Sequence, residues 1–204
     1  MTDNGGEVMD VVSFTRMADG TKADYQFLDE QEGEFMDGLP ARLLEGLSSL
    51  SESFSGYPVS RLEHSLQSAT RAHRAEESEE IVVAALLHDI GDLLAPRSHS
   101  EMAASILRPF VSEKTYWIVK HHGLFQMYYY AHHLGGDRNA RERFLDHPWY
   151  EDAVRFCEEY DQNCFDPDYD SEPLSFFEPM VQRVFRKENS FDEERVARMG
   201  VQPG

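Results

Sequence analysis

Three things are scarce in this chain: cysteine, positive charge and long apolar runs. Its 204 residues include only two cysteines, Cys157 and Cys164. We therefore expect no disulfide framework and a reducing, cytoplasmic environment. No apolar stretch approaches the roughly 20 residues that cross a bilayer, and the N-terminus lacks the apolar segment of a secretory signal. We therefore expect a cytoplasmic protein with no membrane partner.

Acidic residues outnumber basic ones by two to one. The 38 Asp and Glu residues against 19 Lys and Arg residues give a formal net charge of −19, which argues against a nucleic-acid partner and against an anionic membrane surface. An anionic small molecule would need a local positive centre in such a protein. Bound metal ions can provide that centre.

Apolar residues recur at helical spacing along most of the chain, and no alternating run predicts a large sheet. The length is that of one domain. The expected architecture is all-α, with a partly flexible, loose or strand-like lead-in over 1–28, a helical core over 29–186 and a polar tail over 187–204. The expected helices are 29–50, 59–75, 79–90, 99–110, 113–130, 149–163 and 178–186.

Several residues fit the ends of these helices. Pro40 suits a first helical turn. Ser60 with Glu63 forms the pattern of a capping box, and Ser112 is a candidate cap for the helix that follows it.

The dipeptide His88-Asp89 is the most informative feature of the sequence. It closes the apolar run 81–87 and precedes Ile90-Gly91. A histidine and an aspartate at a buried helix end are costly unless something pairs with them. A divalent metal is a common partner, because imidazole nitrogen and carboxylate oxygen are both good ligands.

Four further groups on other expected helices, or at their ends, have suitable chemistry: His64, His99, His122 and Asp161. Taken singly, each is more simply a hydrogen-bonded core or surface group, and His121 remains an alternative to His122. Taken together, six groups are more than one metal ion needs, and helices packed around a core can aim them at one point. The sequence therefore predicts a two-metal site in which Asp89 could bridge. The ligand set suits Fe, Mn or Zn, and its lack of cysteine argues against a structural zinc site.

The pattern His64 … His88-Asp89 … Asp161 resembles the HD-domain superfamily, and the stretch 86–91 is a close match to its core motif. Members of the superfamily are metal-dependent phosphohydrolases or, in a smaller branch, mixed-valent di-iron oxygenases. Added histidines such as His99 and His122 are typical of dinuclear members. The resemblance implies a helical bundle around a dinuclear metal site.

Three segments, 62–69, 99–107 and 122–126, resemble the oxygenases that cleave 1-hydroxyphosphonates. This resemblance implies two iron ions in the Fe(II)/Fe(III) state, with O2 as cosubstrate. One iron would be held by His64, His88, Asp89 and Asp161. The other would be held by Asp89, His99 and His122, which the resemblance makes the catalytic set.

The chain departs from the member of that branch that acts on an aminoethyl-phosphonate. Asp92 stands where a polar or basic contact is expected, Gln126 replaces a Lys and Glu158 replaces an Arg. Phe54 and Tyr57 replace a Tyr–Glu pair.

These changes remove positive charge and add aromatic surface. The segment 125–130, which contains Tyr129, is rich in rings, and Trp149, Tyr150, Tyr160 and Phe165 are nearby in sequence. Most of these rings are expected to be packing, and a minority facing the site could bind a quaternary ammonium group by cation–π contacts. The phosphonate would then be neutralised by iron, with Arg138, His133 and Arg155 as candidate helpers.

The expected reaction is therefore O2-dependent cleavage of 1-hydroxy-2-(trimethylammonio)ethylphosphonate to glycine betaine and phosphate. The substrate is a small organophosphonate, and the oligomeric state stays open between monomer and homodimer. The alternative is an HD-domain phosphohydrolase acting on a small phosphoester or nucleotide. A non-enzymatic regulatory module is a third interpretation, against which the complete ligand set argues.

Overall fold

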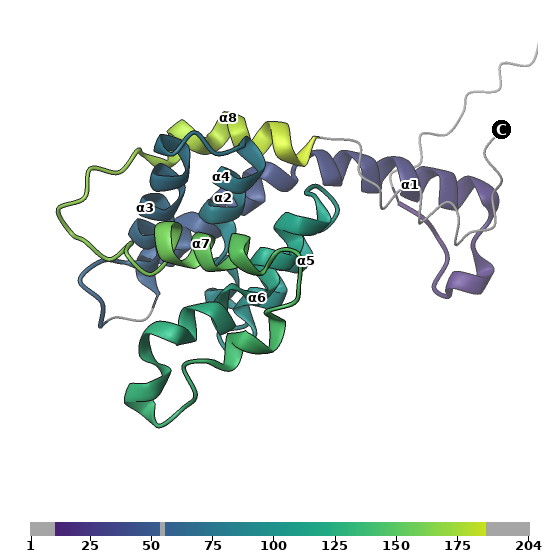
Figure 1. Cartoon of the computed structure of the whole chain (residues 1–204). Coiled ribbons are helices and arrows are strands. Elements are labelled where there is room, and N and C mark those ends of the chain that lie inside the picture. Colours follow the sequence, from purple (N-terminus) through teal and green to yellow (C-terminus); the bar gives the residue numbers. More distant parts are fainter. Residues whose placement is uncertain (1–10, 54–55, 187–204) are drawn as a thin grey trace, which may run out of the picture.

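The computed structural model describes residues 11–53 and 56–186. Within these ranges the protein is built from helices and contains no strand, as the sequence predicted, and most of the helices form one bundle (Figure 1). No helix in this part of the chain has the length and apolar character needed to cross a membrane. Phe54, residues 1–10 of the expected lead-in and the expected tail 187–204 lie outside the described residues.

The helices follow one another along the chain with short connections. The α-helices are α1 (Lys22–Asp37), α2 (Leu39–Ser49), α3 (Arg61–Arg74), α4 (Glu79–Leu87), α5 (His99–Leu107), α6 (Glu113–Tyr130), α7 (Tyr150–Tyr160) and α8 (Leu174–Phe185). Short 3-10 helices are η1 (Met17–Asp19), η2 (Leu50–Glu52), η3 (Ile90–Leu93), η4 (Ala131–Leu134) and η5 (Ala140–Phe144).

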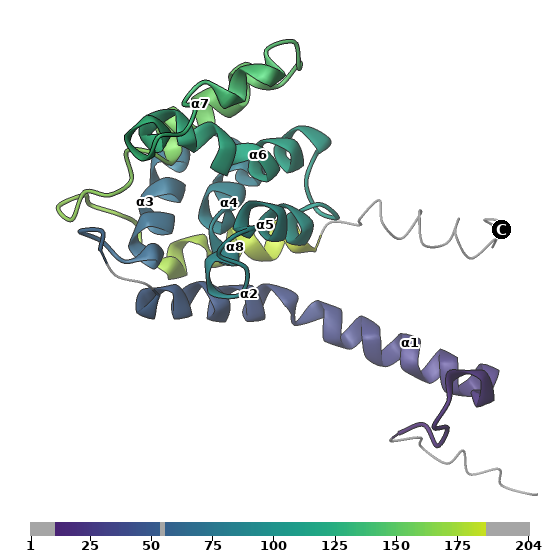
Figure 2. The ribbon, with the colours of Figure 1, turned by 90° about the horizontal axis from the view of Figure 1, so that it is seen from below.

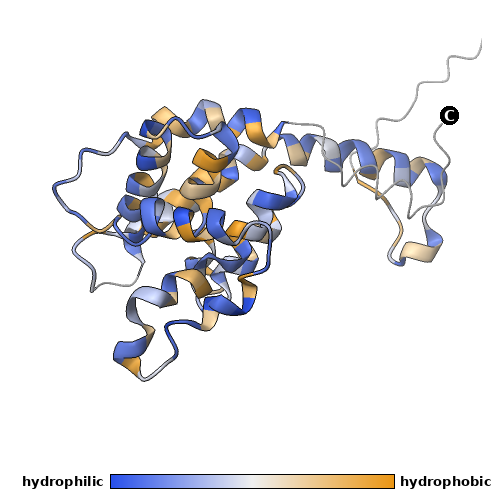
Figure 3. Ribbon diagram, in the orientation of Figure 1, coloured by the Kyte–Doolittle hydropathy of each residue, from blue (hydrophilic) through white to orange (hydrophobic). Residues whose placement is uncertain are grey.

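Helix α4 forms the centre of the bundle. All of its residues from Val82 to Leu87 are buried, and it packs against α3, α6 and α8. A helix that is apolar on every side has to be surrounded by other elements. Figure 3 shows the hydrophobic segments gathered in the bundle, with α1 largely hydrophilic.

The expected helix 29–50 is in fact two helices, and the first of them starts earlier than predicted. Thr21 and Asp24 form a capping box that begins α1 at Lys22, so the expected loose or strand-like lead-in is wrong from that residue on. Gly38 separates α1 from α2, and Pro40 lies in the first turn of α2 as predicted. Helix α1 buries none of its residues and extends away from the bundle (Figure 2).

The predicted caps of two core helices are confirmed. Ser60 and Glu63 form a capping box at the start of α3, and the Ser112 side chain accepts a hydrogen bond from the Thr115 amide at the start of α6. These caps fix the start, and hence the rotational setting, of the two helices that carry His64 and His122.

The helices that lead to Asp89 and Asp161 end before these residues, earlier than predicted. Helix α4 stops at Leu87, and Asp89 has φ −105° and ψ 9°. Helix α7 stops at Tyr160, and Asp161 has φ −129° and ψ −68°. Both carboxylates therefore project from backbone that has left the helical path.

Helix α8 starts at Leu174, not at the expected residue 178, and contains Pro179. Its inward residues Phe177, Val181 and Val184 are buried against α2 and α4. This packing outweighs the helix-breaking tendency of the proline.

Candidate metal centre

The six predicted ligands come together at one place in the bundle. His64 is on α3, His99 is the first residue of α5 and His122 is on α6, while His88 and Asp89 follow α4 and Asp161 follows α7. All are buried except His99, whose side chain is 25% exposed. Three groupings have ligand atoms close enough to hold a metal ion: His64, His88 and Asp161; His88, Asp89 and His122; and Asp89 and His99 with Asp92, which the sequence had not selected as a ligand.

Asp89 lies between two pairs of histidines. Its Oδ2 atom is 3.3 Å from Nε2 of His64 and 3.3 Å from Nε2 of His88. Its Oδ1 atom is 3.4 Å from Nε2 of His99 and 3.4 Å from Nε2 of His122. Each oxygen thus faces one pair, which is the arrangement that a carboxylate needs to bridge two metal ions.

Asp161 belongs to the half of the cluster that contains His64 and His88. Its Oδ1 atom is 3.5 Å from Nε2 of His64 and 3.8 Å from Nε2 of His88. The first half-site therefore has two imidazoles, the terminal carboxylate of Asp161 and one oxygen of Asp89. The second has His99, His122 and the other oxygen of Asp89.

Backbone carbonyls orient three of the imidazole rings. Nδ1 of His64 is 3.0 Å from the Cys164 carbonyl oxygen, and Nδ1 of His88 is 2.7 Å from that of Ala85. Nδ1 of His122 is 2.6 Å from the carbonyl oxygen of Val119. Each Nδ1–H donates to its carbonyl when the ring is a neutral metal ligand, which leaves the Nε2 lone pair directed into the cluster.

The remaining two histidines near the cluster are held differently. His99 Nδ1 is 3.4 Å from Oδ1 of Asp92, so a carboxylate takes the place of the carbonyl that orients the other rings. His121 donates from Nδ1 to the Trp117 carbonyl oxygen, 2.8 Å away, and packs against the Trp117 ring. The structure therefore brings His122, and not His121, to Asp89.

Two buried polar atoms of the cluster, Nε2 of His122 and Oδ2 of Asp161, have no hydrogen-bond partner among the described residues. In addition, Nε2 of His64 and Nε2 of His88 lie only 3.1 Å apart. Unsatisfied buried groups and facing lone pairs are costly, and a bound cation would satisfy them. The nitrogen and oxygen donors fit two metal ions such as iron.

The charges within the cluster support each other. Burial disfavours the charged form of His88, but the carboxylates of Asp89 and Asp161 outweigh it and hold its pKa well above the ordinary value. Burial also disfavours the ionised form of Asp89, but His88, His122 and His64 hold the pKa of this carboxyl well below its usual range. Both aspartates of the cluster are therefore anionic at neutral pH.

A cavity of about 530 Å³ opens onto the cluster. Four of the predicted substrate-binding residues line it: Tyr57, Asp92, Gln126 and Tyr129. Two more rings, Tyr130 and Phe165, also line it. Phe165 stacks on the ring of His64 with centroids 4.5 Å apart, and Tyr57 stacks on Phe165 at 4.7 Å. A stack of rings thus runs from the exposed Tyr57 through Phe165 to His64.

Two of the residues that the sequence assigned to the substrate site lie elsewhere. Glu158 lines a separate surface depression with Arg71 and Arg74, and Arg138 packs over the ring of Tyr128 at 4.1 Å. Glu158 is inside α7, one turn before Asp161, and the two residues line different cavities.

The other two candidate helpers for the phosphonate are also absent from the lining of the cavity. Arg155 pairs with Glu77 at 2.6 Å, and His133 lies exposed against His132.

Arg61 is a residue of the site that the sequence analysis missed. Its Nε donates to Oδ2 of Asp92 at 2.8 Å, and its Nη2 donates to Oδ2 of Asp89. Burial opposes its charge, but these carboxylates outweigh burial and raise the pKa of Arg61 above the ordinary value. A usable signal was its position one helical turn before His64, which places the two side chains on the same face.

Helices arranged around a shared carboxylate and four histidines define a metal-binding α-helical protein. Residues 61–155 match the model of the HD domain. The chain is also 32% identical over 168 residues to the 1-hydroxy-2-(trimethylamino)ethylphosphonate dioxygenase (glycine-betaine-forming) of Leisingera caerulea, an alignment that covers 67% of this chain and 84% of that relative. The chain therefore belongs to the HD-domain family, as its sequence predicted, and it is an oxidoreductase.

Proposed function

We propose that this protein is a di-iron oxygenase that cleaves the C–P bond of 1-hydroxy-2-(trimethylammonio)ethylphosphonate and releases glycine betaine and phosphate. The observation that carries the proposal is the position of Asp89, with one oxygen toward His64 and His88 and the other toward His99 and His122. The relative from Leisingera caerulea, whose name describes this reaction, supports the choice of chemistry.

The histidines and aspartates of the cluster would hold the two iron ions. Iron, when bound, supplies the redox chemistry with O2 that the reaction needs. The overall change consumes one O2 for each substrate, breaks the C–P bond, forms a carboxylate and a phosphate, and releases one proton. No additional reductant is needed for this balance.

The cavity would bind the two charged ends of the substrate at different places and so fix its orientation. Tyr57, Tyr129, Tyr130 and Phe165 line it and offer ring faces to the trimethylammonium group, each contact being worth roughly 0.5–2 kcal/mol. Such a group cannot donate a hydrogen bond, so ring faces suit it better than a set of acceptors. The opposite end of the substrate would then lie at the metal centre, where cations offset its negative charge.

The test is turnover by protein purified without oxygen, with its iron content measured and its mixed-valent state checked by electron paramagnetic resonance. We expect phosphate and glycine betaine to form only after O2 is admitted. Sustained phosphate release without O2 would overturn the proposal. So would turnover of simple phosphodiesters with Zn or Mn alone, which would identify a phosphohydrolase.

A further inference from the structure

Arg61 is the only lysine or arginine among the described residues that line the cavity. It is the first residue of α3, and its side chain is only 11% exposed. Asp92 holds its Nε atom at 2.8 Å, and its Nη2 atom contacts Asp89. The guanidinium is therefore held in the cavity wall by two carboxylates and is not a mobile surface charge.

The cavity wall also carries the carboxylates of Asp89, Asp92 and Asp161. Asp89 and Asp161 face the histidines of the cluster, whereas Asp92 accepts the hydrogen bond from Nε of Arg61. Because Arg61 contacts the same carboxylate that bridges the two half-sites, its positive charge lies directly beside the metal centre. A planar guanidinium with several donors matches the geometry of a tetrahedral oxyanion.

We propose that Arg61 binds the phosphonate group of the substrate and that Asp92 positions its guanidinium. The inference rests on the proposed function, because it takes the anionic end of that substrate to the metal centre. The proposal also explains why a carboxylate is present at position 92. An anion cannot itself bind a phosphonate favourably, but it can hold the Arg61 guanidinium in place. Arg61 then supplies the basic contact, whereas Arg138, His133 and Arg155 do not line the cavity.

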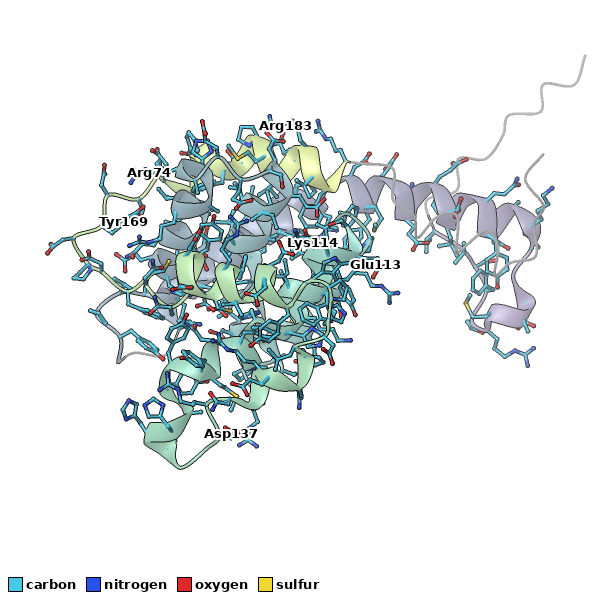
Figure 4. The ribbon with its side chains drawn as sticks, viewed as in Figure 1. Arg74, Glu113, Lys114, Asp137, Tyr169 and Arg183 are labelled. Atoms are coloured by element: carbon cyan, nitrogen blue, oxygen red, sulfur yellow. The ribbon has the colours of Figure 1, made fainter. Side chains whose placement is uncertain are left out.

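Binding to the metal-loaded protein tests this assignment without turnover. Methylphosphonate carries the anion and no ammonium group, and tetramethylammonium carries the cation and no anion. Calorimetric titration with each probe would compare the wild type with Arg61→Gln and Arg61→Lys, after the metal content of every preparation has been measured. Arg74→Gln is the matched control, because Arg74 is on the same helix but lies on the outside of the bundle beside Tyr169 (Figure 4).

We expect Arg61→Gln to weaken methylphosphonate binding roughly 10- to 100-fold, the size of a lost charge-assisted hydrogen bond. Arg61→Lys should lose less, because it keeps the charge without the planar fork. Tetramethylammonium binding should change less than about twofold in both variants, and Arg74→Gln should match the wild type for both probes.

Two results would overturn the assignment while leaving the proposed function intact. One is equal methylphosphonate affinity in the wild type and in metal-replete Arg61→Gln. The other is loss of metal from both Arg61→Gln and Arg61→Lys, which would show that Arg61 serves the metal centre alone. Absence of any methylphosphonate binding to the wild type would instead count against the proposed substrate class, and the assignment would fall with it.

Discussion

The side-chain amide of Gln126 donates a 2.8 Å hydrogen bond from Nε2 to Oδ1 of Asp161. Asp161 faces His64 and His88, so Gln126 orients a ligand of one half-site from outside it. Replacing Gln126 by Leu should weaken metal binding at that half-site roughly 10- to 100-fold, as the loss of such supporting partners typically does. Titration of the metal-free protein with Fe(II) or Mn(II) would measure this.

Gln162 provides the control for this change. It also lines the cavity, but its amide donates to the Glu158 carbonyl oxygen and not to a ligand. Gln162→Leu should therefore leave both metal affinities within about twofold of the wild type. Equal affinities in Gln126→Leu and Gln162→Leu would show that the hydrogen bond to Asp161 does not support the site.

Removal of the shared carboxylate should empty both half-sites. Asp89→Ala should leave less than half an equivalent of metal per chain, because both half-sites lose an anionic ligand. His99→Ala should mainly affect the half-site that His99 shares with His122. Metal analysis after gel filtration would separate the two cases, with the exposed Asp168→Ala as control. Two metal ions retained by Asp89→Ala would contradict the bridging role.

The aromatic lining should favour an N-trimethyl substrate over the free primary amine. A difference of methyl groups in a fitted pocket is worth roughly 1–3 kcal/mol, so kcat/KM should differ by about 10-fold or more. Phe165→Leu should reduce this preference, because it removes the ring between Tyr57 and His64. Phe176→Leu is the control, because Phe176 is on the outer side of α8 beside His73; this substitution should leave the substrate preference unchanged. Equal kcat/KM values for the two substrates in the wild type would defeat the aromatic argument while leaving the metal assignment standing.

Gly91 is required by the close approach of η3 to α5. A Cβ atom at Gly91 would lie 2.7 Å from both the Cα atom and the carbonyl oxygen of His99, so the backbone would have to move. We expect Gly91→Ala to lower the free energy of unfolding by about 1–3 kcal/mol and to weaken metal binding at His99.

Gly46 allows a matched glycine-to-alanine comparison. It is inside α2, and a Cβ atom there would meet only the side chain of Ile90, at 3.7 Å. Gly46→Ala should therefore raise the free energy of unfolding by about 0.5–1 kcal/mol. Urea denaturation would measure both variants, and a Gly91→Ala protein as stable as the wild type would contradict the steric argument.

The sequence was sufficient to predict the helical class and to name six residues that the structure brings together. Helical periodicity marks the core helices, and the His88-Asp89 pair identifies the centre of the site. Helix ends were less predictable, because they depend on local hydrogen bonds. The Thr21–Asp24 capping box extends α1 toward the N-terminus, and the burial of α8 accommodates Pro179.

The lining of the cavity was harder to predict than the ligands. Whether a residue faces a cavity depends on the rotation of its helix and on the residue at which the helix stops. Glu158, inside α7, does not line the cavity, whereas Asp161, directly after the end of α7, does. Arg61 is an ordinary charged residue in sequence; its position one turn before His64 puts it on the same helix face, but its hydrogen bond to Asp92, 31 residues away, is seen only in the folded structure.

The distribution of the ligands along the chain has a consequence for the order of folding. The His64 ring is oriented by the Cys164 carbonyl, 100 positions away, and no helix carries more than one of the histidines that face Asp89. Closing loops of this length is entropically costly and slow compared with forming a single helix. The half-site of His64 and His88 is therefore complete only after the end of α7 has docked with Asp161 and Cys164, whereas His99 and His122 of the other half-site, and Asp89, all precede α7 in the chain.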